Sequence, residues 1–180
     1  MRRSVLFALP ALVFLAFVGL FFSRLGENPG AVPSVLLNTP LPSFQLAALP
    51  GREEGLSSDD ITGQVSLINV FASWCAACLY EHPTFMDVTE KNNVPIFGIN
   101  WRERAPDDGT QWLARHGNPY QRVGVDPKGL AAVDLGVTQA PQTFVLDATG
   151  TIRYRHDGPV TEEVWQTVLH PLVQKLRSHT

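Results

Sequence analysis

Two cysteines, Cys75 and Cys78, lie in the segment FASWCAACLYEHP and are the only cysteines in the sequence. A C-x-x-C pair can bind a metal, tether a haem, close a loop or exchange electrons as a dithiol. Covalent haem attachment requires a histidine directly after the second cysteine, and Leu79 stands there instead. A zinc site needs about four ligands, and the histidines of the chain form no second ligand pair at a suitable spacing. We therefore expect neither a metal nor a haem.

Redox chemistry explains the pair better than a structural disulfide, because stabilisation by loop closure is smallest for a short loop. Cys75 follows the apolar, β-branched run VSLINVF (65–71), which is typical of a buried strand, and opens a helix predicted over 76–91. The free N–H groups of a helix N-terminus favour a thiolate. Cys75 is therefore the expected nucleophile, and Cys78, one turn further, the thiol that resolves the mixed disulfide.

Short apolar runs and helical segments alternate on both sides of this motif. The order is strand, helix, strand, helix, then a hairpin and a closing helix, which predicts an α/β fold with a central mixed sheet flanked by helices. Pro83 is expected to interrupt the first helix, Asp107 or Asp108 to cap the second, and Thr161 to cap the last. The predicted strands are 43–47, 65–71, 94–100, 122–125, 142–147 and 151–156, and the predicted helices are 76–91, 107–117, 128–136 and 161–178.

The N-terminal part of the chain holds most of its apolar excess. Residues 5–22 carry no charge, and ~20 apolar residues span a bilayer. Arg2 and Arg3 favour an N-in orientation, which puts the remainder outside the cytoplasm. The following SRLGENPGA offers no A-x-A cleavage site, which favours an uncleaved anchor over a cleaved signal peptide. We expect an anchor over 1–26 with its transmembrane helix at about 5–22, a Pro-rich linker over 27–42 and a folded domain over 43–180.

The composition narrows the class of function. The net charge is −3 and the pI is near 5.9, whereas nucleic-acid-binding proteins normally present a basic face. The 180 residues suffice for one domain of ordinary size and an additional segment. We therefore expect no binding of nucleic acid. We also expect a monomer, because a thiol-exchange site needs a free face for its partner.

Three segments resemble the CcmG/DsbE family of thiol:disulfide interchange proteins, the cytochrome c maturation branch of the membrane-anchored, TlpA-like thioredoxin superfamily. They are NVFASWCAACLYEHP, GINWRERAPDDGTQWLARHGNPY and GVTQAPQTFVLDATGTIRYRHDGPV, and the resemblance covers roughly residues 38–176 and the N-terminal anchor. It implies a thioredoxin-like fold on a bacterial inner-membrane anchor, facing the periplasm. It also implies a reductase that keeps the CxxCH cysteines of apocytochrome c, or of a partner maturation protein, reduced for haem attachment. Its own disulfide is its redox group, no further cofactor is expected, and a membrane thiol transporter re-reduces it.

The resemblance also assigns roles beside the cysteines. Pro141 matches the cis-proline of thioredoxin-like folds, in a loop expected to lie against the C-x-x-C motif. The backbone of Ala140 is then exposed to pair with an extended partner chain. Trp74, directly before the nucleophile, is expected on the surface that faces the partner.

Four further residues bear on the chemistry of the thiols. Asn69 occupies the position of a buried aspartate in many thioredoxins and cannot titrate. Glu81 is either an acid–base group near the thiols or part of a solvated helix face. His82 is expected to make local helix or loop contacts rather than to bind a ligand. Gln142 stands where the family commonly has glutamate, so any tuning by that carboxylate is lost here.

Three alternatives to a cytochrome c maturation reductant stay open from the sequence. One is a general envelope disulfide reductase of the TlpA type. Another is an oxidant that introduces disulfides, whose mark would be a strongly stabilised reduced form. The third is a non-enzymatic binding module in which the C-x-x-C motif is incidental.

Overall fold

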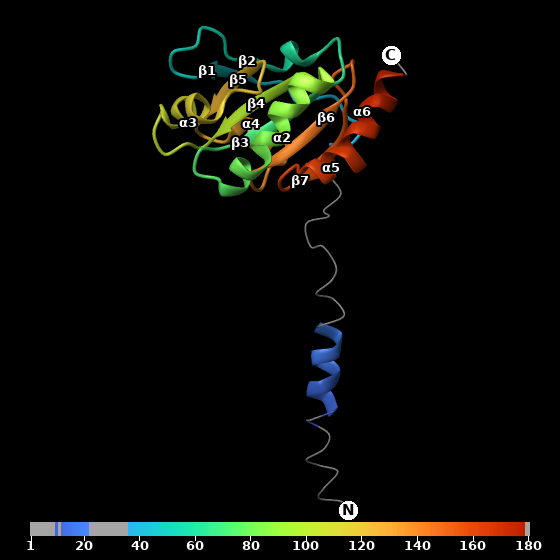
Figure 1. Cartoon of the computed structure of the whole chain (residues 1–180). Coiled ribbons are helices and arrows are strands. Elements are labelled where there is room, and N and C mark those ends of the chain that lie inside the picture. The colour runs from blue at the N-terminus through green and yellow to red at the C-terminus, as the bar shows by residue number, and fades with distance from the viewer. Residues whose placement is uncertain (1–9, 11, 22–35, 179–180) are drawn as a thin grey trace, which may run out of the picture. The chain divides into compact units, whose positions relative to one another are not determined.

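A computed structural model describes residues 10, 12–21 and 36–178 (Figure 1). The chain divides into two compact units, Met1–Pro33 and Ser34–Thr180. In the first unit residues 12–21 are helical. Across the described ranges, no helix combines the length and the apolar character that a membrane span requires. Residues 5–9, 11 and 22 of the predicted transmembrane segment (5–22) and residues 27–35 of the predicted linker (27–42) lie outside the described residues.

The second unit is built on a mixed sheet, as predicted. In the described part of the chain its strand order is β2-β1-β5-β4-β3-β6-β7. Strands β3, β4 and β5 are parallel, and β1, β6 and β7 each run antiparallel to a neighbour. Every residue of β3 is buried, as its unbroken apolar run predicts for a strand covered on both faces. The strands are β1 (Gln45–Ala48), β2 (Leu56–Ser57), β3 (Ser66–Phe71), β4 (Ile96–Trp101), β5 (Arg122–Asp126), β6 (Gln142–Leu146) and β7 (Ile152–Asp157).

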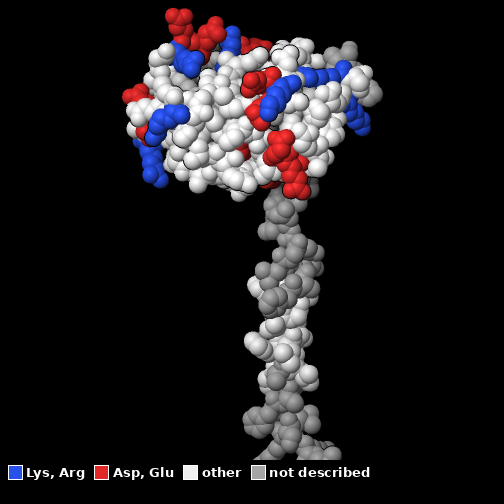
Figure 2. Space-filling model, in the orientation of Figure 1, with Lys and Arg blue, Asp and Glu red and all other residues white. Residues whose placement is uncertain are grey.

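Helices cover the two faces of the sheet and enclose two separate cores. Leu67 and Phe71 of β3 pack in one core with side chains of α2, α3 and the closing helix. Ile68 and Val70 point to the opposite face and pack in a second core with residues of η1 and α4. These helices are η1 (Ser58–Ile61), α2 (Ala76–Asn92), α3 (Asp108–His116) and α4 (Leu130–Asp134), and the closing helix comprises α5 (Glu162–Val164), η2 (Trp165–Leu169) and α6 (His170–Arg177). On the face seen in Figure 2, acidic and basic side chains are interspersed.

The predicted interruption of the first helix at Pro83 is wrong, since α2 continues through it. A proline inside a helix removes one backbone hydrogen bond and costs ~3 kcal/mol. His82 and Phe85, on either side, are both buried, and their packing outweighs this cost. The closing helix instead departs from regular geometry before Pro171. There the N–H of His170 donates to the carbonyl of Trp165 in a π-helical turn.

The predicted helix ends are partly correct. Thr161 caps the closing helix, because its hydroxyl accepts a hydrogen bond from the N–H of Val164. Helix α3 ends at Gly117, as predicted. Asp107 occupies the N-cap position of α3, as predicted, but its side chain makes no cap hydrogen bond. The Asp108 carboxylate accepts from the N–H of Ala105. The Asp108 carboxylate therefore stabilises the turn that precedes α3 and not the first turn of the helix.

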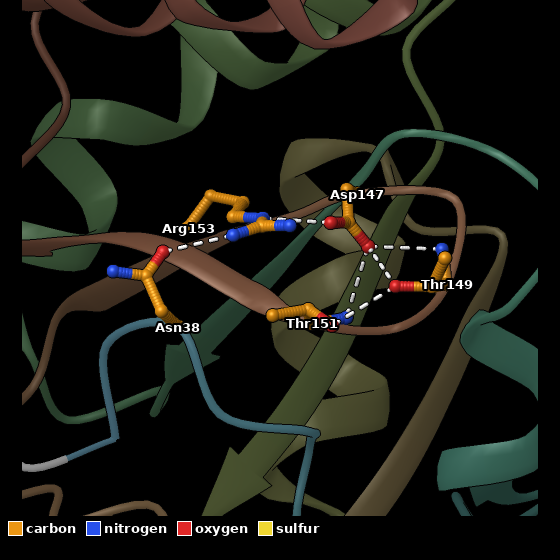
Figure 3. Close-up of polar contacts among 5 residues, drawn as sticks. All are labelled: Asn38, Asp147, Thr149, Thr151 and Arg153. Atoms are coloured by element: carbon orange, nitrogen blue, oxygen red, sulfur yellow. Dashed lines mark hydrogen bonds and ion pairs between the residues drawn. The ribbon is translucent and has the colours of Figure 1, made fainter. Parts of the chain in front are cut away.

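A polar cluster lies at the turn between β6 and β7 (Figure 3). Because Leu146 pairs with Ser66 at the start of β3, this turn is at the end of the sheet opposite to the one that leads to the cysteines. The Asp147 carboxylate accepts hydrogen bonds from the N–H groups of Thr149 and Thr151 and from the Thr149 hydroxyl. Its other oxygen binds Nε of Arg153 at 2.7 Å, and Nη1 of Arg153 donates to Oδ1 of Asn38 at 2.9 Å. Burial raises the pKa of Asp147, but these hydrogen bonds outweigh burial and leave the pKa below its ordinary value. We call these five residues the hairpin cluster.

Candidate active site

Cys75 and Cys78 form a disulfide between the end of β3 and the first turn of α2, with their Cα atoms 5.3 Å apart. Cys75 is the N-cap of α2, and the N–H of Cys78 donates to Sγ of Cys75 at 3.1 Å. Cys75 is 6 % exposed and Cys78 1 %, so Cys75 is the more exposed residue of the pair. When the pair is reduced, an N–H directed at this sulfur favours its thiolate. The order predicted from sequence, in which Cys75 attacks and Cys78 resolves, requires such a contact at Cys75 and stays a prediction.

Trp74 directly precedes Cys75 and is 41 % exposed. Its indole Nε1 donates to the carbonyl of Arg102 at 3.0 Å, in the loop that follows β4. The Glu103 carboxylate of the same loop accepts from the N–H of Ser73 at 2.7 Å and from its hydroxyl at 2.5 Å. The amide of Asn100 also donates to Glu103, at 2.6 Å. The loop after β4 therefore holds the turn that carries Trp74 and leads into Cys75. Sequence reasoning missed Glu103, although it lies in a segment that carries the family resemblance.

The Ala140–Pro141 peptide bond is cis, as the resemblance implies. Pairing of Val70 with Gln142 brings this loop to the end of β3 where the cysteines lie. Ala140 is partly buried and packs against the core that contains both cysteines. The carbonyl of Pro141 accepts from the N–H of Gly158 at 3.0 Å, which ties the loop to the segment after β7.

Gln142 is fully buried at the start of β6. Its Nε2 donates to Oδ1 of Asp157 at 2.6 Å, and Nε of Arg155 donates to the same oxygen at 2.7 Å. Arg155 also donates to the carbonyl of Gly136, before the cis-proline loop. The described hydrogen bond of Gln142 thus anchors that loop to β7. A charged partner, Asp157, stands beside the position where the family commonly has glutamate.

Glu81 is buried, being 1 % exposed, so the sequence-based alternative of a solvated helix face is wrong. Residues three apart on a helix share a face, and Glu81 follows Cys78 on the buried face of α2. Oε1 of Glu81 accepts from Nδ2 of Asn69 at 2.9 Å, and Oε2 from the N–H of Val160 at 2.9 Å. Burial raises the pKa of Glu81 to about 8, while these two hydrogen bonds work against the rise.

Asn69 links Glu81 to a residue that sequence reasoning did not single out. The hydroxyl of Tyr120 donates to Oδ1 of Asn69 at 2.8 Å. Nδ2 of Asn69 also lies 3.2 Å from the hydroxyl of Thr143, on β6. Tyr120 is the last residue of the family-like segment ending in GNPY, but no periodicity or spacing marks it as part of the site.

His82 makes local contacts, as predicted. Its Nε2 lies 3.2 Å from the carbonyl of Gly117, and its ring meets Trp112 edge-on at 4.5 Å. Burial lowers the pKa of His82, which favours the neutral ring. In the part of the chain that the structure describes, no group of three or more His, Cys, Asp or Glu side chains is arranged to hold a metal ion.

A C-x-x-C disulfide at a helix N-terminus within a strand–helix–strand unit, near a cis-proline loop, places the chain among the thioredoxin-fold thiol:disulfide oxidoreductases. The family model described as Redoxin matches residues 36–169. The chain is 38 % identical to the thiol:disulfide interchange protein DsbE of Allochromatium vinosum, over 93 % of this chain and 92 % of that one. It is 36 % identical to the thiol:disulfide interchange protein HelX of Rhodobacter capsulatus, over 96 % and 97 %.

Solved structures agree with this grouping. A crystal structure from Chlorobium tepidum, described as a thiol:disulfide interchange protein DsbE, superposes with a TM-score of 0.64 at 25 % identity, covering 76 % of this chain and 95 % of that one. A secreted thiol-disulfide isomerase from Corynebacterium glutamicum gives a TM-score of 0.65 at 26 % identity, over 82 % and 96 %. The chain belongs to the redoxin family and, within it, to the DsbE/HelX thiol:disulfide interchange proteins.

Proposed function

We propose that the chain is a membrane-anchored reductant of the periplasm that serves cytochrome c maturation. Its partner is apocytochrome c, in which it reduces the disulfide of the CxxCH motif, or a thiol protein of the maturation pathway, in which it reduces the corresponding cysteines. A thiol transporter in the inner membrane returns the electrons, and the chain works as a monomer without a bound cofactor. The proposal rests on membership of the DsbE/HelX family and on the apolar, uncharged run over residues 5–22.

The single observation that carries the chemistry is the N–H of Cys78 directed at Sγ of Cys75 at 3.1 Å. In the reduced chain the Cys75 thiolate attacks one sulfur of the partner disulfide, forming a mixed disulfide and releasing the other partner sulfur as a thiolate, which takes up a proton. Cys78 then loses its proton and attacks Sγ of Cys75. The second partner sulfur leaves as a thiolate and is protonated. Two electrons pass to the partner, and the chain is left with the Cys75–Cys78 disulfide seen here.

Within this proposal Glu81 exchanges the proton of Cys78. It lies one turn beyond Cys78 on the same buried face, and Cβ atoms at this spacing on a helix are about 5–6 Å apart. A pKa of about 8 lies close to neutral pH, where a general base or acid is most effective. Glu81 thus supplies on α2 the titratable carboxyl that Asn69 lacks on β3.

Two measurements on the full chain in detergent test this function. The first is the reduction potential, equilibrated against dithiothreitol. A value clearly more reducing than the ~−120 mV of a strong oxidant supports a reductant, and a value near it would overturn the proposal in favour of a disulfide-forming oxidant.

The second measurement traps the partner. Cys78→Ala leaves the mixed disulfide unresolved, so partners from an envelope extract stay bound and can be identified by mass spectrometry. Polypeptides joined through a CxxCH cysteine support a role in cytochrome c maturation. A set of unrelated envelope proteins indicates the general reductase instead. Cys75→Ser is the control, because without the attacking sulfur no mixed disulfide forms.

A further inference from the structure

Tyr120 contributes a buried hydroxyl to the proton-exchange site although it is distant from the cysteines in sequence. It is 6 % exposed, and its ring stacks on Phe71, the last residue of β3, with centroids 4.8 Å apart and an interplanar angle of 20°. This stacking holds the Tyr120 ring in one orientation and so determines the position of its hydroxyl. The hydroxyl donates to Oδ1 of Asn69 at 2.8 Å.

The contact with Tyr120 determines which way the Asn69 amide faces. An asparagine side chain has one acceptor oxygen and one donor NH₂ group. Because Tyr120 occupies the oxygen, the NH₂ group is directed to Oε1 of Glu81 at 2.9 Å. The opposite orientation would set an amide oxygen against the Glu81 carboxylate and remove one of its two described donors.

We propose that Tyr120 is a positioning residue of the thiol-exchange site: through Asn69 it holds an amide donor on Glu81 and so favours the ionised carboxylate, the form that accepts the proton of Cys78. The inference rests on the proton-exchange role proposed for Glu81. Its physical basis is that a hydrogen bond donated to a carboxylate stabilises the charged form more than the neutral form.

The other groups around Glu81 do not orient the Asn69 amide toward the Glu81 carboxylate. Strand β6 contributes Thr143, which is neutral and meets Asn69 rather than Glu81. The segment before α5 contributes the N–H of Val160, a backbone group that cannot titrate. Burial raises the pKa of Tyr120 well above its ordinary value, so its hydroxyl stays protonated. The titratable groups that α2 places near Glu81 are Cys78 and, at the helix N-cap, Cys75, when the pair is reduced. His82, the next residue along α2, contacts the Gly117 carbonyl and not Glu81.

The test is a pH profile of the resolving step. The reduced full chain in detergent is mixed with a peptide containing one internal disulfide, and the rate of Cys75–Cys78 disulfide formation is followed from pH 5 to pH 10. Tyr120→Phe keeps the ring and its stacking but removes the hydroxyl. We expect the ionisation assigned to Glu81 to move up by about half to one pH unit, because the ionised form has lost a well-directed donor.

Two comparisons separate this inference from the function on which it rests. Tyr154→Phe, which removes a hydroxyl from a partly buried residue packed against the same core, should leave the profile in place. Glu81→Gln should remove the ionisation altogether. If Glu81→Gln does so and Tyr120→Phe lowers the rate equally at all pH values, or changes nothing, then Tyr120 is merely structural and the inference is overturned while Glu81 keeps its role. If Glu81→Gln leaves the profile unchanged, both are wrong.

A second variant covers the case in which Tyr120→Phe does not fold. Asn69→Ala removes the amide itself and should shift the same ionisation in the same direction. An unshifted ionisation in a folded Asn69→Ala chain would also overturn the inference, since Tyr120 acts on Glu81 through this amide.

Discussion

The two ends of the central sheet each enclose a carboxyl group, and they do so in opposite ways. Near the disulfide, Glu81 is surrounded by neutral donors, and burial prevails, so its pKa rises to about 8. At the far end burial also raises the pKa of Asp147, but donors from Thr149, Thr151 and the cationic Arg153 outweigh it, and the pKa falls below its ordinary value. Asp147, which is 9 % exposed and accepts four hydrogen bonds from Thr149, Thr151 and Arg153, is thus held as an anion. Glu81, which is 1 % exposed and accepts two described hydrogen bonds, has too few donors to offset its deeper burial.

The largest expected effect is at the disulfide itself. Cys75→Ser removes the attacking sulfur and should abolish reduction of peptide disulfides, leaving the sheet and both of its ends folded. Turnover is measured with a reductant in excess, and circular dichroism checks the fold. Residual turnover in a folded Cys75→Ser chain would mean that Cys78 can attack by itself, and the order of the two thiols would be wrong.

Glu81→Gln tests the burial of the carboxyl near the disulfide through its effect on stability. The native pKa of about 8 lies above the unfolded value of 4.5. Between these values the native state retains a proton that the unfolded state has lost, so wild-type stability should fall as pH rises from about 5 to 8. Each pKa unit corresponds to about 1.4 kcal/mol, so the dependence should be large enough to measure. Urea unfolding of the oxidised chain should show a much flatter dependence in Glu81→Gln; equal slopes in both chains would contradict the burial argument.

Asp147→Ala tests the ionic end, and its pH dependence has the opposite sign. A lowered native pKa stabilises the fold above the unfolded value of 3.8, and this contribution is lost as pH falls through the native pKa. Removal of the carboxylate leaves several donors unpaired, which should cost about 1–3 kcal/mol at pH 7. The difference between variant and wild type should narrow at pH 3. Asp87→Ala is the control, since that residue forms an exposed i,i+4 pair with Lys91 and such pairs contribute little.

Glu103→Ala should have the smallest effect, confined to the turn that carries Trp74. Without this carboxylate the loop after β4 no longer holds Ser73, and the turn that carries Trp74 loosens. We expect KM for a peptide disulfide to rise about three- to tenfold, the equivalent of about one hydrogen bond, while the rate with a small disulfide such as oxidised glutathione changes little. Glu103→Gln, which keeps an acceptor for the Ser73 N–H, should restore much of the loss. A similar fall with both substrates would instead indicate misplacement of Cys75.

The sequence alone predicted the fold and the two cysteines because both depend on local pattern. The apolar runs identify β3, β4 and β6, and the position of Cys75 between a strand and a helix identifies the site. The surroundings of the two cysteines depend instead on contacts between segments that are distant in the sequence. Glu81 is buried because Asn69 and Val160 converge on it from β3 and from beyond β7, and Glu103 meets Ser73 across β3 and β4. No spacing within one segment encodes such contacts.

The hairpin cluster also determines where the chain enters the domain. Asn38, near the start of the described part of this unit, is held by Arg153 at the far end of the sheet, whereas the cysteines lie beyond the opposite end of β6. That strand has five residues, or about 17 Å at ~3.3 Å per residue. A pull applied to the chain before Asn38, or its immobilisation on a solid support, would therefore act on Asp147 and Arg153 and leave the reactive sulfurs free to meet a partner from solution.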